Sequence, residues 1–254
     1  MHGEEFSKGD SFIHRLDPRF KIVLFLAFAL TVALSRRVET ASMAFLISLI
    51  LLISARLEIS LVFKRLLFAN FFVAFLWLFL PFSYEGQPLF SVLGFNATEK
   101  GLKESLLITL KCNAILVATF SLLATVPLVE LGYSFSSLGF PKKLVHLFFF
   151  VVRYVFLLHE EYLRLHSAMR VRCFKPRSNL HTYRTLAFLA GMLLVRSFER
   201  AERIFAAMKC RAFKGEFYIL KELKAKKSDA LFATVFLLLI LLLGFLECKH
   251  AKLL

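Results

Sequence analysis

The sequence has little charge for its length and few of the residues that interrupt hydrophobic runs. Of its 254 residues only 20% are charged, and it contains ten glycines and six prolines. Acidic residues are scarcest, with 18 Asp and Glu against 33 Lys and Arg. A soluble domain normally has about a quarter of its residues charged. The composition therefore argues against a soluble globular enzyme and excludes a disordered chain.

Motifs of catalysis, nucleotide binding and metal binding are also missing. The four cysteines form no CxxC pair, and the sequence has no GxxxxGK[ST], GxGxxG, HExxH or GxSxG motif. His159 and His166 are seven residues apart, so a polar helix face explains them better than a metal site. The sequence therefore predicts a protein that is not an enzyme, with no catalytic residues, no bound metal and no cofactor.

Long apolar runs are what the sequence has in excess. Hydrophobic residues make up 58% of it, 31 of them Phe, and the mean hydropathy is +0.69. A bilayer core needs about 20 helical residues, and flanking Lys and Arg can extend a shorter run. We predict an all-α integral membrane protein with five transmembrane helices, over residues 22–35, 41–55, 66–82, 105–126 and 231–246. Lys111, inside the fourth run, is interpreted as a snorkelling lysine.

Basic residues are concentrated in one segment. Residues 127–228 contain 19 Lys and Arg and seven Glu, a net charge of +12 out of the total +15, whereas residues 83–104 have a net charge of −1. Basic loops stay on the cytoplasmic side of a membrane. This predicts a transmembrane domain over 1–126, a cytoplasmic domain over 127–228 and a C-terminal transmembrane helix over 229–254, with 83–104 external. The positive charge thus orients the chain in the bilayer, and no nucleic-acid partner is predicted.

Two long helices are expected in the cytoplasmic segment, over 141–172 and 181–213. The run 144–158 is apolar enough to span a membrane, but a span there would place a heavily basic stretch outside. Pro141 is typical of a helix start, and Pro176 favours a break between the two helices. A shorter helix is expected near 127–138.

The two long helices end in the same pattern. Both ends read Ala-Met-[Arg/Lys]-x-Arg-small-Phe, with Arg172 in the first and Arg211 in the second, 39 residues apart. The helix dipole alone favours a cation in the last turn, but it does not account for the small residue and Phe that follow. We interpret the two ends as paired docking tips, in which the Arg binds a carboxylate and the Phe is an apolar anchor. The tip residues are Val171, Arg172, Cys173 and Phe174, and Cys210, Arg211, Ala212 and Phe213.

Several segments resemble the transmembrane T components of energy-coupling factor (ECF) transporters. They are the start from Gly9 to Lys21, Leu138-Gly139-Phe140-Pro141, Arg153-Tyr154 with Glu160-Glu161, and 196–203. The resemblance covers nearly the whole chain in order. The surroundings of the two arginines are most similar to the cobalt and nickel branch, the CbiQ-like proteins, although the Gly-Asp-Ser opening also occurs in general T components.

The resemblance implies a multi-pass protein of the cell membrane that has no activity of its own. It implies two ATP-binding cassette ATPases as partners, docked on Ala-Arg-Gly-like triplets that correspond here to 171–173 and 210–212. It also implies a separate membrane subunit that binds the substrate, cobalt or nickel ion. A general T component shared by vitamin-specific subunits is the alternative within the family. An autonomous channel or secondary transporter is the alternative from another class.

Overall fold

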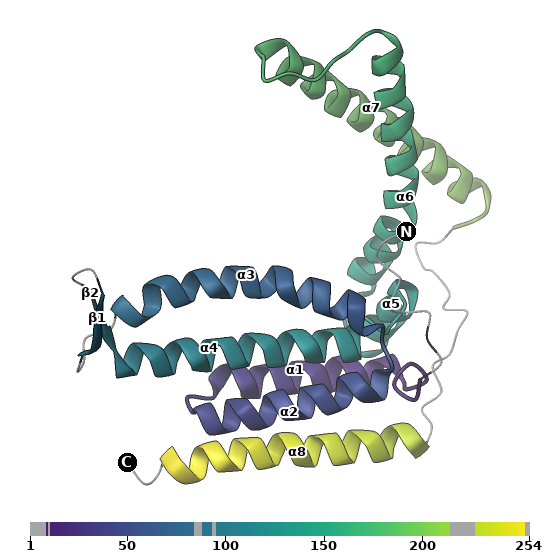
Figure 1. The fold of residues 1–254 in the computed structure, drawn as a ribbon. Helices are drawn as coiled ribbons and strands as arrows, with labels where there is room; N and C mark the ends of the chain where they lie inside the picture. The colour runs from purple at the N-terminus through teal and green to yellow at the C-terminus, as the bar shows by residue number, and fades with distance from the viewer. Residues whose placement is uncertain (1–8, 10, 84–87, 93–94, 214–226, 252–254) are drawn as a thin grey trace. The chain divides into compact units, whose positions relative to one another are not determined.

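The computed structural model describes residues 9, 11–83, 88–92, 95–213 and 227–251 (Figure 1). The chain divides into two compact units, Met1–Ser134 with Leu223–Leu254 and Phe135–Glu222, called here the first and the second unit. The predicted domain boundaries at 126/127 and 228/229 are defined by sides of a membrane, and they stay a prediction.

The fold is helical, as predicted from the sequence. One short antiparallel hairpin, which was not predicted, pairs Pro88–Val92 with Phe95–Thr98. The elements in order are α1 Pro18–Leu34, α2 Val38–Ala55, α3 Ile59–Ser83, β1 Pro88–Val92, β2 Phe95–Thr98, α4 Glu99–Ala118, a π-helical turn Thr119–Leu123, α5 Leu128–Ser137, α6 Lys142–Val171, α7 Leu180–Cys210 and α8 Lys227–Ala251.

Helices long and apolar enough to cross a bilayer are all in the first unit. Among the described residues there are four: Val38–Ala55, Ile59–Pro81, Glu99–Leu123 and Ser228–Glu247. They correspond to four of the five predicted spans. The remaining predicted span lies in α1, whose 17 residues are at the lower limit of what crosses a hydrocarbon core. These helices are those of a multi-pass membrane protein.

The start of α1 is held by a capped and charged network. Asp17 caps the helix by accepting a hydrogen bond from the backbone N–H of Arg19 at 3.0 Å, with Pro18 as the first helical residue. Lys21 in the first turn is only 1% exposed, and its Nζ donates to the carbonyl of His14. The carboxylates of Asp17, Glu130 and Asp229 act on it electrostatically. A buried ammonium is stable only with such compensation, so this network joins α1, α5 and α8.

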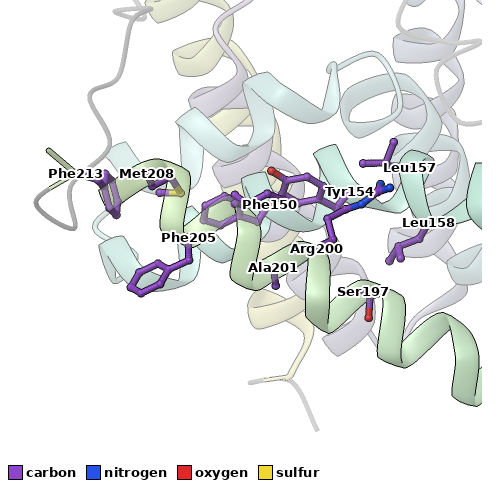
Figure 2. Close-up of a pocket in the computed structure, with 11 residues that line it drawn as sticks. Phe150, Tyr154, Leu157, Leu158, Ser197, Arg200, Ala201, Phe205, Met208 and Phe213 are labelled. Carbon is purple, nitrogen blue, oxygen red and sulfur yellow. The ribbon is translucent and has the colours of Figure 1, made fainter. Parts of the chain in front are cut away.

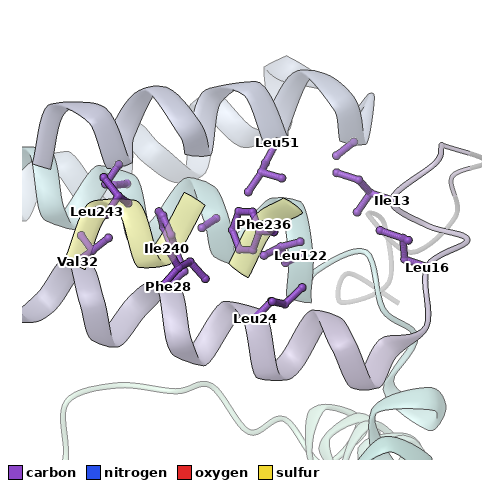
Figure 3. Packing of buried hydrophobic residues seen from close by; sticks show 14 residues of the cluster. Ile13, Leu16, Leu24, Phe28, Val32, Leu51, Leu122, Phe236, Ile240 and Leu243 are labelled. Atoms are coloured by element: carbon purple, nitrogen blue, oxygen red, sulfur yellow. The ribbon is translucent and has the colours of Figure 1, made fainter. Parts of the chain in front are cut away.

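An apolar core holds the first unit together. Helix α4 packs against α2 and α3, and α1 packs against α8 and α4. Phe28 of α1 is fully buried, and its ring centroid lies 5.8 Å from that of Phe236 in α8 (Figure 3). At the far end of the α3–α4 pair a Cβ on Gly101 would lie 2.8 Å from the Cα of Pro81, so only glycine fits there.

Polar side chains join these helices along their length. Asn70 of α3 and Asn113 of α4 exchange two amide hydrogen bonds, of 2.8 and 2.9 Å. Lys111 donates from Nζ to the carbonyl of Ala33 at the end of α1, at 3.1 Å. The lysine inside the fourth span therefore binds a helix terminus, where a cation is favoured. Such bonds hold helices together in a bilayer, where apolar contact with lipid competes with helix packing.

The second unit contains the two long helices that the sequence predicts. Gly139, with φ +88°, follows the end of α5, and Pro141 precedes α6, which confirms the shorter helix near 127–138 and the helix start at Pro141. Helix α6 has 30 residues and α7 has 31, so each is about 45 Å long. Phe135, Phe140 and Phe148 pack their rings together at the base of α6.

Candidate functional site: the two helix ends

The end of α6 is a complete Schellman cap. Arg172 is the cap residue, and Cys173 after it has a left-handed backbone with φ +59°. The N–H of Cys173 donates to the carbonyl of Arg170 at 3.0 Å, and the N–H of Phe174 donates to the carbonyl of Met169 at 3.1 Å. These two bonds define the motif and satisfy carbonyls that the helix leaves open.

The end of α7 repeats the same geometry. Arg211 is the cap residue, and Ala212 has φ +56°. The N–H of Ala212 donates to the carbonyl of Lys209 at 3.0 Å, and the N–H of Phe213 donates to that of Met208 at 3.1 Å. The two ends are therefore one local structure built twice, with the same residue type at the cap.

The cap explains most of the repeated sequence pattern. A Schellman motif is usually accompanied by an apolar contact between the positions that Met and Phe occupy here. The residue with positive φ has to be small or flexible, which accounts for Cys173 and Ala212. The sequence analysis interprets the small residue and Phe as parts of a docking tip, with the Phe as its apolar anchor. The cap gives them a role inside this chain, and it leaves the arginines as the part of the pattern that needs another explanation.

Both arginines are exposed, and the described residues contain no hydrogen-bond or ion-pair partner for either side chain. Their role as cap residues uses only the backbone, so a Schellman cap does not require arginine. The neighbouring Lys209 differs, because its Nζ lies 4.6 Å from the ring centroid of Phe205 on its own helix. Each tip thus presents an exposed guanidinium at the negative end of a helix dipole, without an ion-pair partner in the described part of the chain.

An apolar groove runs between α6 and α7 and reaches the tip of α7 (Figure 2). Its volume is about 450 Å³. From α6 it is lined by Phe150 and Tyr154, whose rings stack with centroids 5.9 Å apart. From α7 it is lined by Met208 and Phe213, the two apolar residues of the cap. The second helix end is therefore packed beside an open apolar surface.

The two helices are joined by an ion pair beside this groove. Glu161 of α6 accepts a hydrogen bond from the guanidinium of Arg196 of α7, and Arg164 lies 3.7 Å from its other carboxylate oxygen. The hydrogen bond from Arg196 lowers the pKa of the Glu161 carboxyl below its usual 4.5. The carboxyl is therefore ionised at neutral pH, and the ion pair is lost only when the pH falls through this lowered pKa.

The described residues contain no cluster of His, Cys, Asp or Glu that could hold a metal ion. The rings of His159 and His166 flank that of Tyr162, at centroid distances of 6.3 and 5.8 Å. They form an aromatic row along α6.

The structure places the predicted tip residues at two separate helix ends, four consecutive positions in each. The sequence reasoning did not find the bond between Glu161 and Arg196, although both lie in segments with the family resemblance. Opposite charges on two long helices were the available signal, but sequence alone does not say which of Glu160 and Glu161 faces α7. The sequence also contains a signal for the two caps, since Met, a small residue and Phe stand at the positions that a Schellman motif favours. The sequence reasoning did not use it.

The fold and the two capped ends define a class: a multi-pass helical membrane protein with a pair of long helices that expose basic tips. Residues 9–219 match the sequence model of the family described as "Cobalt transport protein", CbiQ. The chain belongs to this family.

Relatives with assigned names cover most of the chain. The energy-coupling factor transporter transmembrane protein EcfT of Brevibacillus brevis is 26% identical over 94% of this chain and 96% of its own length. The EcfT of Bacillus subtilis is 29% identical over 83% of this chain and 84% of its own. An uncharacterized protein of Methanocaldococcus jannaschii is 33% identical, over 48% of this chain and 46% of its own length. The family match and the two EcfT relatives identify the chain as a T component of the ECF transporter type, a subunit located in the cell membrane.

Proposed function

We propose that this chain transmits ATP-driven motion from two ATPase subunits to a separate membrane subunit that binds the substrate, and that the cargo is cobalt or nickel ion. It acts as a coupling subunit with no catalytic step of its own. The observation that carries the proposal is the duplicated helix end, with an exposed arginine at the same position of the same cap that has no side-chain partner among the described residues.

The geometry suits docking into two acidic grooves. A Schellman cap fixes the direction in which each chain turns away, so the arginine projects from a rigid end. Its planar guanidinium can bind a carboxylate with two parallel hydrogen bonds. Phe174 and Phe213 provide apolar surface next to it. Two equal tips fit two equal or similar partners, and Val171, Cys173, Cys210 and Ala212 complete the contact surface.

The family description favours cobalt as the cargo, with nickel as its chemical neighbour. The relatives that span most of the chain are named energy-coupling factor transporter transmembrane proteins, with no substrate in the name. A general T component shared by vitamin-specific substrate-binding subunits is therefore the second candidate. A channel or secondary transporter that works alone is the candidate from another class.

Uptake measurements separate these functions. Cells that lack cobalt uptake would express the chain with its ATPases and the substrate-binding subunit, and labelled cobalt would be counted. We expect uptake that needs all components and is lost in R172A/R211A. Vitamin uptake without cobalt uptake would establish the general T component. Uptake by the chain without ATPases would contradict the proposal.

A further inference from the structure

The contact between the two long helices depends on a small region. Helices α6 and α7 contact each other over a stretch that is short compared with their length. Leu158 of α6 and Ser197 of α7 lie in it, because they line both the apolar groove and a second, polar cavity of about 230 Å³ beside it, which Glu161 and Arg196 also line. The bond between Glu161 and Arg196 lies in this stretch. The side chain of Glu161 is only 13% exposed, and that of Arg196 is 48% exposed.

We propose that Glu161 and Arg196 form a clasp that fixes the angle at which α6 and α7 cross, and thereby the spacing between the two tips. The inference rests on the proposed function for its biological meaning, since it assigns the positioning residues of the same coupling device. The claim that this ion pair fixes the crossing angle concerns the chain alone and can be tested without any partner.

The charges around the crossing make Glu161 the critical member. Three guanidinium groups act on its carboxylate, those of Arg196 and Arg200 from α7 and that of Arg164 from α6. Glu199, the other acid beside this cavity, lies 3.9 Å from Arg203 on its own helix. Without Glu161, cations of both helices would face one another, and like charges at short range repel. The carboxylate therefore both attracts α7 and cancels the repulsion across the crossing.

Because the clasp lies far from the tips, a small change in the crossing angle displaces the tips by a large distance. Arg172 follows Glu161 by 11 residues, or about 17 Å of helix, and Arg211 follows Arg196 by 15 residues, or about 23 Å. A rotation of about 10° at the crossing moves a point 23 Å away by about 4 Å. That displacement exceeds the tolerance of a bidentate hydrogen bond, so an unfixed crossing would misplace an arginine relative to its carboxylate.

The chain supplies its own reporters for this spacing. Cys173 and Cys210 are exposed free cysteines at the ends of α6 and α7. After replacement of Cys112 and Cys248 by Ser, spin labels on the two tip cysteines give the distribution of tip-to-tip distances by pulsed electron paramagnetic resonance. The full-length chain in lipid nanodiscs is used, without ATPases.

We expect one narrow distance distribution in the parent chain and a distribution at least twice as wide in E161Q and in R196Q. The charge-swapped variant E161R/R196E should recover part of the narrowing, which a purely steric role would not produce. E160Q is the matched control, because Glu160 is the exposed neighbour of the same type. E199Q breaks an ion pair within one helix and should also leave the width unchanged.

An unchanged width in both E161Q and R196Q would overturn the clasp. So would equal broadening in E160Q. Neither result bears on docking, because no ATPase is present. Conversely, loss of ATPase binding in Arg172 or Arg211 variants with a normal distance distribution would leave the clasp intact, so the two accounts fail separately.

Discussion

The two units of this protein achieve order in different ways. In the first unit, α1, α2, α4 and α8 share one buried apolar cluster, and amide and lysine hydrogen bonds connect neighbouring helices along their length. In the second, two helices of about 45 Å meet over a short stretch, and their ends are ordered by local caps. The contacts of the first unit are thus spread along its helices. In the described part of the second unit, α6 and α7 contact each other around one crossing, and on the proposal above this crossing sets the relative position of their ends.

The comparison predicts that a core truncation in the first unit has the largest effect on stability. Phe28→Ala removes a fully buried ring that packs on Phe236. In a bilayer this loses close packing and leaves a cavity, and we expect a cost of about 3 kcal/mol in the free energy of unfolding. Steric-trapping measurements in bicelles would give the value.

Leu30→Ala is the matched control, since Leu30 lies on the same helix and is 65% exposed. It should lower the free energy of unfolding by less than about 1 kcal/mol, because the exposed side chain faces lipid in both the folded and the unfolded state. Equal costs for the two variants would mean that the first unit has no specifically packed core.

A smaller and opposite effect is expected at the end of α6. Cys173 has φ +59°, where a Cβ is unfavourable and glycine is free of strain. Cys173→Gly should therefore stabilise the last turn by roughly 0.5–1 kcal/mol, and slow amide hydrogen exchange at Phe174, whose N–H closes the cap. The fold of the first unit should not respond. Faster exchange at Phe174 would show that the cap depends on the cysteine side chain.

Much of this fold could be read from the sequence, because its signals are local. Apolar runs indicate α2, α3, α4 and α8. Asp17-Pro18 marks the start of α1, and Gly139, with its positive φ, marks the end of α5. The basic residues around the two long helices distinguished them from transmembrane helices. These features depend on residues within one or two helical turns of one another, so they can be recognised from the order of residues along the chain.

Contacts between distant segments could not be read in this way. Asn70 binds Asn113 over 43 residues and Glu161 binds Arg196 over 35, and neither pair has a spacing that sequence could single out. The pattern at the helix ends was found, and the cap adds a role inside the chain for its small residue and Phe. Among the described residues, the side chains of Arg172 and Arg211 have no such contact.

The central claim is that those two arginines bind partners, and the affinity of the ATPase subunits for the full chain in nanodiscs tests it most directly. Truncating one member of a buried charge pair costs roughly 2–5 kcal/mol, about 30-fold or more in the dissociation constant of that contact. Because two tips bind together, R172A or R211A alone should leave partial binding and R172A/R211A should abolish it. Arg170→Ala and Lys209→Ala are controls from the same last turns, expected to change the free energy by at most about 1 kcal/mol. Equal and small effects at all four positions would contradict the docking account.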